Sequence, residues 1–178
     1  LLMNDQLQAE LKKIFNGRFS TSLSTRTNYA RGEDTYDPIL SKAVVFPETN
    51  QEVSQILRLC NEHKIPVVPF GTGTSLEGNV VGNEKGITIS LEKMNKILSV
   101  NAEDFDCRVQ ACVTKEQLNE YLREDGVFFP IDPGANAAIG GMASTSASGT
   151  MAVKYGTMKT VITGLTVVLP NGDIINTG

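Results

Sequence analysis

Residues 69–78 read PFGTGTSLEG and continue directly from the apolar residues 65–68. That apolar run predicts a buried β-strand, and its two prolines favour a sheet edge or the ends of the strand. Glycines in a loop after a strand permit left-handed backbone angles, so that successive amide N–H groups can converge on an anion. The hydroxyls of Thr72, Thr74 and Ser75 add donors. The stretch is typical of a phosphate-binding loop, although a glycine-rich turn without a ligand explains these residues alone equally well.

The loop matches neither of two common nucleotide-binding motifs. A Walker loop requires Gly-Lys-Ser/Thr, which does not follow, and G-x-G-x-x-G requires a third glycine where Leu76 stands. A carboxylate at Glu77 would be unfavourable beside a bound anion. We therefore expect Glu77 to face solvent or to pair with a basic side chain.

The residues on both sides of the loop predict alternating strands and helices. Apolar runs at 43–46, 65–69 and 86–91 predict three strands. A helix carrying the apolar side chains of Val53–Cys60 lies between the first two, and Thr49 or Asn50 can cap it. The order strand, helix, strand indicates a right-handed parallel crossover.

The N-terminal part predicts one helix and one irregular segment. Residues 5–15 carry apolar side chains at helical spacing, and Gly17 ends this pattern. Residues 18–37 are rich in Ser, Thr, Asn and Gly, and predict an extended or looping arm that covers the body of the protein.

A second lobe is predicted after residue 96. It begins near residues 97–100, and residues 107–113, whose apolar and polar side chains alternate, predict a half-buried strand. Thr114 is the expected cap of the next helix, and Gln117 can reach back to complete a capping box. The apolar face of that helix comprises Leu118, Tyr121 and Leu122.

A hairpin is predicted near the end of the chain. Its turn is Pro170–Asp173, in which Asn-Gly supplies positive φ angles. The elements together predict an α+β fold of two lobes. The expected organisation is a helix and arm at 1–37, a first α/β lobe with the loop at 38–96, and a second α+β lobe at 97–178.

Residues 129–149 read FPIDPGANAAIGGMASTSASG and show no helical or strand period. Small residues let a backbone approach a flat ligand closely, and backbone amides are the expected contacts because Asp132 is the one charged side chain. Tight packing of two layers is the alternative. Asp132 precedes a proline, so a role in forming a turn is at least as good an interpretation as a ligand contact. Lys154 in the following KYGTM could meet a phosphate, but a surface lysine is the more ordinary reading.

Composition and charge argue against several function classes. The 178 residues include 16 basic and 20 acidic side chains, and the net charge of −4 leaves no large cationic surface for nucleic acid. His63 is the one histidine, which argues against histidine triads and His-rich metal sites and favours capping of a helix C-terminus. Three cysteines without a C-x-x-C pair favour buried thiols in a reducing compartment. No apolar stretch approaches the ~18 residues of a membrane span, and the N-terminus does not resemble a signal peptide, so a cytoplasmic location is expected.

The order of these pieces resembles a known family. The strand with PFGTGTSLEG, the segment at 129–149, KYGTM and the C-terminal GLTVVLPNGDIINTG are similar to the PCMH-type FAD-binding domain of the flavin oxidoreductases typified by vanillyl-alcohol oxidase. Within them, the chain is most similar to the cytochrome-type D-lactate dehydrogenases and related D-2-hydroxy-acid dehydrogenases. The resemblance covers residues 40–178 and implies two α+β lobes with FAD held between them.

The resemblance also implies the residues that hold the cofactor. The pyrophosphate would be wrapped by Gly71, Thr72, Gly73, Thr74, Ser75 and Leu76. The adenosine-diphosphate and flavin-ring sides would be lined by Asp132, Pro133, Gly134, Gly140, Gly141, Thr145, Ser148 and Gly149. Some relatives bond the flavin to a histidine of this loop, but Thr74 stands at the matching position, so non-covalent FAD is expected. No catalytic residue and no metal ligand is assigned.

In the family, the FAD domain continues into further strands and a substrate domain that holds the catalytic residues. The chain is therefore expected to be the C-terminally incomplete FAD-binding part of an enzyme that oxidises a D-2-hydroxy acid, D-lactate to pyruvate in the first place, and passes electrons to a cytochrome or quinone. An inactive nucleotide-binding module is one alternative, and the same chemistry on glycolate or another 2-hydroxy acid is another. The full-length enzyme could be peripheral to a membrane. A strand edge left unpaired at Gly178 invites pairing with a second copy, so a homodimer is expected.

Overall fold

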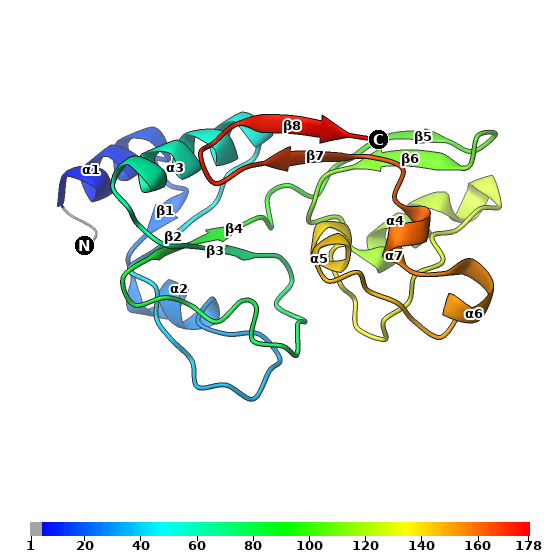
Figure 1. Cartoon of the computed structure of the whole chain (residues 1–178), viewed down its shortest axis with the longest axis horizontal. Coiled ribbons are helices and arrows are strands. Elements are labelled where there is room, and N and C mark those ends of the chain that lie inside the picture. Colours follow the sequence, from blue (N-terminus) through cyan, green and yellow to red (C-terminus); the bar gives the residue numbers. More distant parts are fainter. Residues whose placement is uncertain (1–4) are drawn as a thin grey trace. The chain divides into compact units, whose positions relative to one another are not determined.

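The computed structural model describes residues 5–178 and divides into two compact units (Figure 1). Unit 1 contains the residues up to Lys93 together with Leu165–Gly178, and unit 2 contains Met94–Gly164. The units therefore differ from the predicted lobes at the hairpin, which groups with unit 1. The first four residues of the predicted N-terminal segment lie outside the described residues.

A four-stranded sheet forms the centre of unit 1 (Figure 1). Its order is β1-β2-β4-β3, with β1 antiparallel to β2 and the other three strands parallel. The edge position of β3 was expected from its prolines, since proline cannot donate to a ladder. The elements of the unit are α1 (Asp5–Ile14), β1 (Phe19–Ser20), α2 (Leu23–Asn28), β2 (Ala43–Val45), α3 (Asn50–Glu62), β3 (Val67–Phe70), β4 (Ile87–Ser90), β7 (Leu165–Val168) and β8 (Ile174–Thr177).

One apolar core joins this sheet to α1 and α3, which lie on the same side of it in Figure 1. Residues two apart on β2 and on β4 contribute to this core, because alternate side chains of a strand face the same way. The helical spacing predicted for the N-terminal segment is confirmed. The buried members are Leu7, Leu11, Phe15, Ala43, Val45, Ile56, Cys60, Ile65, Ile87 and Ile89. Burial raises the pKa of the Cys60 thiol to about 12, so this cysteine behaves as a small apolar side chain.

The prediction of an extended or looping arm over 18–37 is compatible with the short strand β1 but is wrong at the helix α2. Residues Phe19 and Ser20 form β1, and α2 begins after Ser22, whose hydroxyl accepts a hydrogen bond from the Thr25 N–H at 3.3 Å. This helix has the sequence LSTRTN, in which Ser, Thr and Asn are weak helix formers. Its periodicity is too short to detect, and the cap is the local feature that marks it.

The ends of α3 follow the sequence closely. The Thr49 hydroxyl accepts from the Glu52 N–H at 3.2 Å, and His63 is the C-cap. The predicted cap and the position of His63 at the helix C-terminus are therefore confirmed.

The β7–β8 hairpin is held against α3 through its turn. The Ser54 hydroxyl donates to the Gly172 carbonyl at 2.5 Å, and a β-carbon at Gly172 would lie 2.3 Å from Cγ of Arg58. Only Gly172 of the Asn-Gly pair has a positive φ, +86°, whereas positive φ angles were predicted for both residues of the pair. Leu169 and Asp173 still pair, so the loop has three residues and ends in a left-handed glycine.

Unit 2 combines a two-stranded antiparallel sheet with short helices. The elements are β5 (Ile97–Asn101), β6 (Asp106–Val109), α4 (Lys115–Leu122), the 3₁₀ turn η1 (Arg123–Asp125), α5 (Ile139–Ser144), α6 (Ala152–Tyr155) and α7 (Met158–Val161). The strand predicted to reach residue 113 ends at Val109. Helix α5 lies inside the segment predicted to lack regular structure.

The cap of α4 agrees with the sequence only in part. The Thr114 hydroxyl accepts from the Gln117 N–H at 3.2 Å, but the Gln117 side chain donates to the Asn95 carbonyl at 2.8 Å instead of closing a capping box. Leu118 and Leu122 are buried as predicted, whereas Tyr121 is 60% exposed, so its assignment to the apolar face is wrong. Among the helices that the structure describes, none is long and apolar enough to cross a membrane.

An ion pair fastens the start of β1 to α3. The two terminal nitrogens of Arg18 donate to the two carboxylate oxygens of Glu52 at 2.7 and 2.6 Å, and each side chain is about a quarter exposed. The hydrogen bond from Arg18 is the main cause that lowers the pKa of Glu52.

Replacing Glu52 by Gln is expected to destabilise the fold by about 1–2 kcal/mol at pH 7, because the charge-assisted bonds are weakened in a partly exposed site. A lowered carboxyl pKa stabilises the folded state above the unfolded pKa, and this contribution disappears as the pH falls through the folded value. Urea unfolding at pH 7 and at decreasing pH below 4.5 should therefore show the variant and the wild type converging. The exposed pair Arg123–Glu120 gives the control, since Glu120→Gln should change stability little at either pH.

Candidate functional site

The loop Gly71–Gly78 begins where β3 ends at Phe70. Gly73 has φ +74°, and a β-carbon there would lie 2.8 Å from Cζ of Phe70. Glycine is needed at this position both for the left-handed backbone and for the contact with the Phe70 ring. The loop therefore turns over the aromatic side chain that precedes it.

The side chains of the loop are exposed or weakly engaged. The hydroxyl oxygens of Thr72 and Thr74 lie 3.3 Å apart, and the Ser75 hydroxyl accepts from Nδ2 of Asn79 at 3.1 Å. Leu76 is 69% exposed, and Glu77 is exposed, as expected for a carboxylate beside an anion site.

The backbone N–H groups of the loop are available to a ligand. Within residues 5–178, no protein group accepts a hydrogen bond from the N–H of any residue in Gly71–Leu76. A run of backbone donors without protein acceptors, in a loop with a left-handed glycine, is the arrangement that binds anions. The loop can therefore take a negatively charged ligand without breaking a bond of its own.

The N-terminal arm supports this loop, which the sequence did not indicate. The Glu33 N–H donates to the Gly73 carbonyl at 2.9 Å, and a β-carbon at Gly32 would lie 2.4 Å from the Gly73 oxygen. At the other end of the loop, a β-carbon at Gly78 would lie 2.7 Å from the Tyr36 ring. In the sequence of the arm, Gly32 is the residue that permits this close approach to the loop backbone.

In unit 2, Asp132 is held by two donors. Its Oδ1 accepts from Nζ of Lys115 at 2.7 Å and from the Gly134 N–H at 3.1 Å. The hydrogen bond from Lys115, followed by that from Gly134, lowers the pKa of Asp132. The second bond is that of a turn, as the Asp-Pro sequence suggested. Lys115 was not predicted as a site residue, and it sits in the first turn of α4.

Two of the predicted glycines are explained by packing. A β-carbon at Gly149 would lie 1.8 Å from the Asp132 carbonyl oxygen, and one at Gly140 would lie 2.8 Å from Cβ of Ala111. The Gly140 N–H also donates to the Ala111 carbonyl at 2.8 Å. Close packing therefore accounts for glycine at positions 140 and 149, as the alternative interpretation held.

The other predicted residues of this segment face open space. A β-carbon at Gly141 or Gly134 would meet nothing within 4 Å. The side chain of Thr145 donates to the Gly141 carbonyl at 3.2 Å, and the remaining exposed residues are Pro133 and Ser148. Packing gives no reason for glycine at Gly141. Lys154 is exposed, with Nζ 4.9 Å from the centre of the Tyr155 ring.

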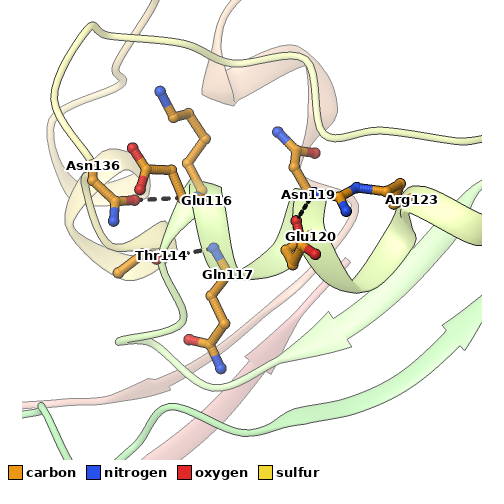
Figure 2. A pocket seen from close by; sticks show the side chains of 8 residues that line it. Thr114, Glu116, Gln117, Asn119, Glu120, Arg123 and Asn136 are labelled. Atoms are coloured by element: carbon orange, nitrogen blue, oxygen red, sulfur yellow. Dashed lines mark hydrogen bonds and ion pairs between the residues drawn. The ribbon is translucent and has the colours of Figure 1, made fainter.

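A hollow of about 760 Å³ lies along the outer side of α4, and Figure 2 shows its polar lining. Asn136, Glu116, Glu120 and Arg123 take part in it. Lys115 also lines the hollow, but none of the predicted cofactor residues does. The hollow is therefore not the site that the glycine-rich segments indicate.

Lys115→Met is expected to raise the pKa of Asp132, because it removes the largest cause of the lowered value. A carbon-detected NMR titration of the Asp132 carboxyl group measures this change. Lys154→Met is the matched control, since its ammonium lies over a ring and not against a carboxylate. An unchanged Asp132 titration in Lys115→Met would contradict the ion pair.

The chain is similar to curated D-lactate dehydrogenases. It is 40% identical to "D-lactate dehydrogenase [cytochrome], mitochondrial" of Arabidopsis thaliana over 97% of this chain and 31% of that protein. It is 44% identical to "Probable D-lactate dehydrogenase, mitochondrial" of Danio rerio over 89% of this chain and 32% of that protein. The chain thus spans about a third of the length of these relatives.

Solved structures agree on the fold. The chain matches alkyldihydroxyacetonephosphate synthase with a TM-score of 0.89 at 22% identity, over 98% of this chain and 34% of that one. It matches p-cresol methylhydroxylase with a TM-score of 0.84 at 24% identity, over 98% and 35% of the two chains. The predicted α+β architecture of the PCMH type is confirmed. Residues 41–178 match the family described as FAD binding domain, which is more than half of the chain, and the protein therefore belongs to that family.

Proposed function

We propose that this chain is the FAD-binding part of a flavin-dependent oxidoreductase that oxidises a D-2-hydroxy acid, with D-lactate as the first candidate, to the 2-keto acid. The observation that carries the proposal is the loop Gly71–Leu76, whose backbone donors have no acceptor within residues 5–178. The curated relatives named as D-lactate dehydrogenases support the substrate class.

The diphosphate of FAD suits the loop for a charge reason. A protein with a net charge of −4 gains little long-range attraction for an anion, so local donors must supply the binding. Backbone N–H groups do so without a basic side chain. The hydroxyls of Thr72, Thr74 and Ser75 lie on the same loop as further donors.

The segment Asp132–Gly149 would line the adenosine-diphosphate and flavin-ring sides. The exposed positions Pro133, Gly134, Gly141 and Ser148 leave backbone open to a flat ligand. Gly140 and Gly149 serve this surface indirectly, because their close packing keeps its shape.

FAD, when bound, would accept the hydride equivalent that the substrate gives up, while this chain binds and orients the cofactor. We place the residue that takes the substrate proton outside these 178 residues. Thr74 carries no ring nitrogen to bond the flavin, so we propose non-covalent binding at this loop. A cytochrome as electron acceptor is supported by the name of the Arabidopsis relative. The acceptor, a homodimer and a cytoplasmic location with peripheral membrane association stay predictions.

Titration of the purified chain with FAD and with ADP is expected to give saturable binding of both, because the two ligands share the diphosphate. Flavin fluorescence and calorimetry measure it. With D-lactate, glycolate or D-2-hydroxyglutarate added, reduction of bound flavin by D-lactate would support the leading substrate. FAD binding without reduction by any of them agrees with the leading proposal, which places the proton acceptor outside these residues, and equally with a second candidate, a nucleotide-binding module that is inactive by itself. Reduction by any of these acids would rule out the second candidate. Failure to bind either nucleotide would contradict both.

Gly141→Leu is expected to keep the stability of the wild type and to weaken FAD binding about tenfold or more, equivalent to about 1.4 kcal/mol. The leucine side chain would project from α5 into open space, where it clashes with no protein atom but obstructs the bound cofactor. Lys159→Leu, which adds a similar side chain to an exposed position of α7, is the control. Unchanged FAD affinity in Gly141→Leu would remove Gly141 from the proposed site.

A further inference from the structure

The arm segment Gly32–Tyr36 contacts the loop Gly71–Gly78, and the buried carboxylate of Asp34 stabilises the conformation of this segment. Asp34 is only 7% exposed. Its Oδ2 accepts from the Gly32 N–H at 3.1 Å, and its Oδ1 accepts from the Tyr36 N–H at 3.0 Å. Each donor is two residues from Asp34, so the side chain closes a tight turn on both sides of itself.

The residues that Asp34 holds are the ones that contact the loop. Gly32 approaches the Gly73 carbonyl so closely that a β-carbon would lie 2.4 Å from the oxygen. Between them, the Glu33 N–H donates to the same carbonyl at 2.9 Å. The ring of Tyr36 packs so closely against Gly78 that a β-carbon there would lie 2.7 Å from it. Gly73 and Gly78 of the loop therefore both contact a turn whose conformation depends on the side chain of Asp34.

We propose that Asp34 is a positioning residue for FAD, which holds the Gly73 carbonyl and hence the amides of Thr72–Leu76 in the conformation that receives the diphosphate. The inference rests on the proposed function. A loop that adopts its binding conformation only part of the time binds with an affinity reduced by that fraction. Asp34 would thus act on affinity without touching the cofactor.

The charge of Asp34 makes the role distinguishable from simple electrostatics. A carboxylate near an anion site repels the anion, so neutralising it would tighten FAD binding if charge alone mattered. The positioning role requires the opposite result, since neutral variants lose an acceptor for the Gly32 or Tyr36 N–H and loosen the turn.

The test compares Asp34→Ala and Asp34→Asn with the control Asn171→Ala. Asn171 Oδ1 also accepts from an N–H two residues further on, that of Asp173 at 3.0 Å, but in the hairpin turn. Fluorescence titration should show the Kd for FAD raised about tenfold in Asp34→Ala, equivalent to about 1.4 kcal/mol. Asp34→Asn keeps one carbonyl acceptor and should raise it about threefold, while the control stays within about twofold. Equal or tighter binding in the Asp34 variants, or an equal loss in Asn171→Ala, would overturn the proposal.

A second measurement separates this inference from the proposed function. Backbone ¹⁵N order parameters of Thr72, Thr74 and Ser75 are recorded without FAD, with thermal unfolding to show that each variant is folded. They should fall in both Asp34 variants and stay unchanged in Asn171→Ala. Unchanged order parameters in folded Asp34 variants would overturn the positioning role. A wild-type chain that binds no FAD, with lowered order parameters in the variants, would contradict the proposed function and leave the role in holding the loop supported.

Discussion

The structure of unit 1 depends on the complete burial of β4 between two parallel neighbours. Every residue from Ile87 to Ser90 is buried, and the strand pairs with β2 on one side and β3 on the other. Parallel strands end at the same edge of a sheet, and ligands of such sheets bind beyond the carboxyl ends. The pairing therefore determines where the chain leaves β3, and the glycine-rich loop starts at that edge.

The sequence predicted the elements whose patterns are strong and local. Runs such as Ile87–Ser90 are apolar or small throughout, and α3 has both a cap at Thr49 and an apolar stripe. Helices α2 and α5 were missed because six residues make less than two turns, too few to show a period. Helix α5 is built on IGGMAS, and contacts such as that of Gly140 with Ala111 hold it, which only tertiary structure reveals.

The candidate site was predictable to the extent that it consists of backbone. Glycines in the loop and at 129–149 mark positions where a side chain would obstruct a neighbouring group, and the structure shows which group that is. At Gly73, Gly140 and Gly149 the neighbouring group belongs to the protein, while Gly141 faces open space that a ligand can occupy. The contact of Glu33 with Gly73 and that of Lys115 with Asp132 join residues far apart along the chain, so no local pattern predicts them.

The hairpin that closes unit 1 has a consequence for how the chain acquires its structure. The Ser54 hydroxyl donates a hydrogen bond to the Gly172 carbonyl, 118 residues further along the sequence, and all residues of unit 2 come between these two in the sequence. Contacts of such long sequence separation form late, because the intervening loop must first be closed. During synthesis on a ribosome, the face of α3 around Ser54 therefore stays uncovered until Met94–Gly164 and then the hairpin residues Leu165–Gly178 have emerged. The unit that begins first is thus completed last, and a nascent chain stalled within the second unit would expose that face to chaperones.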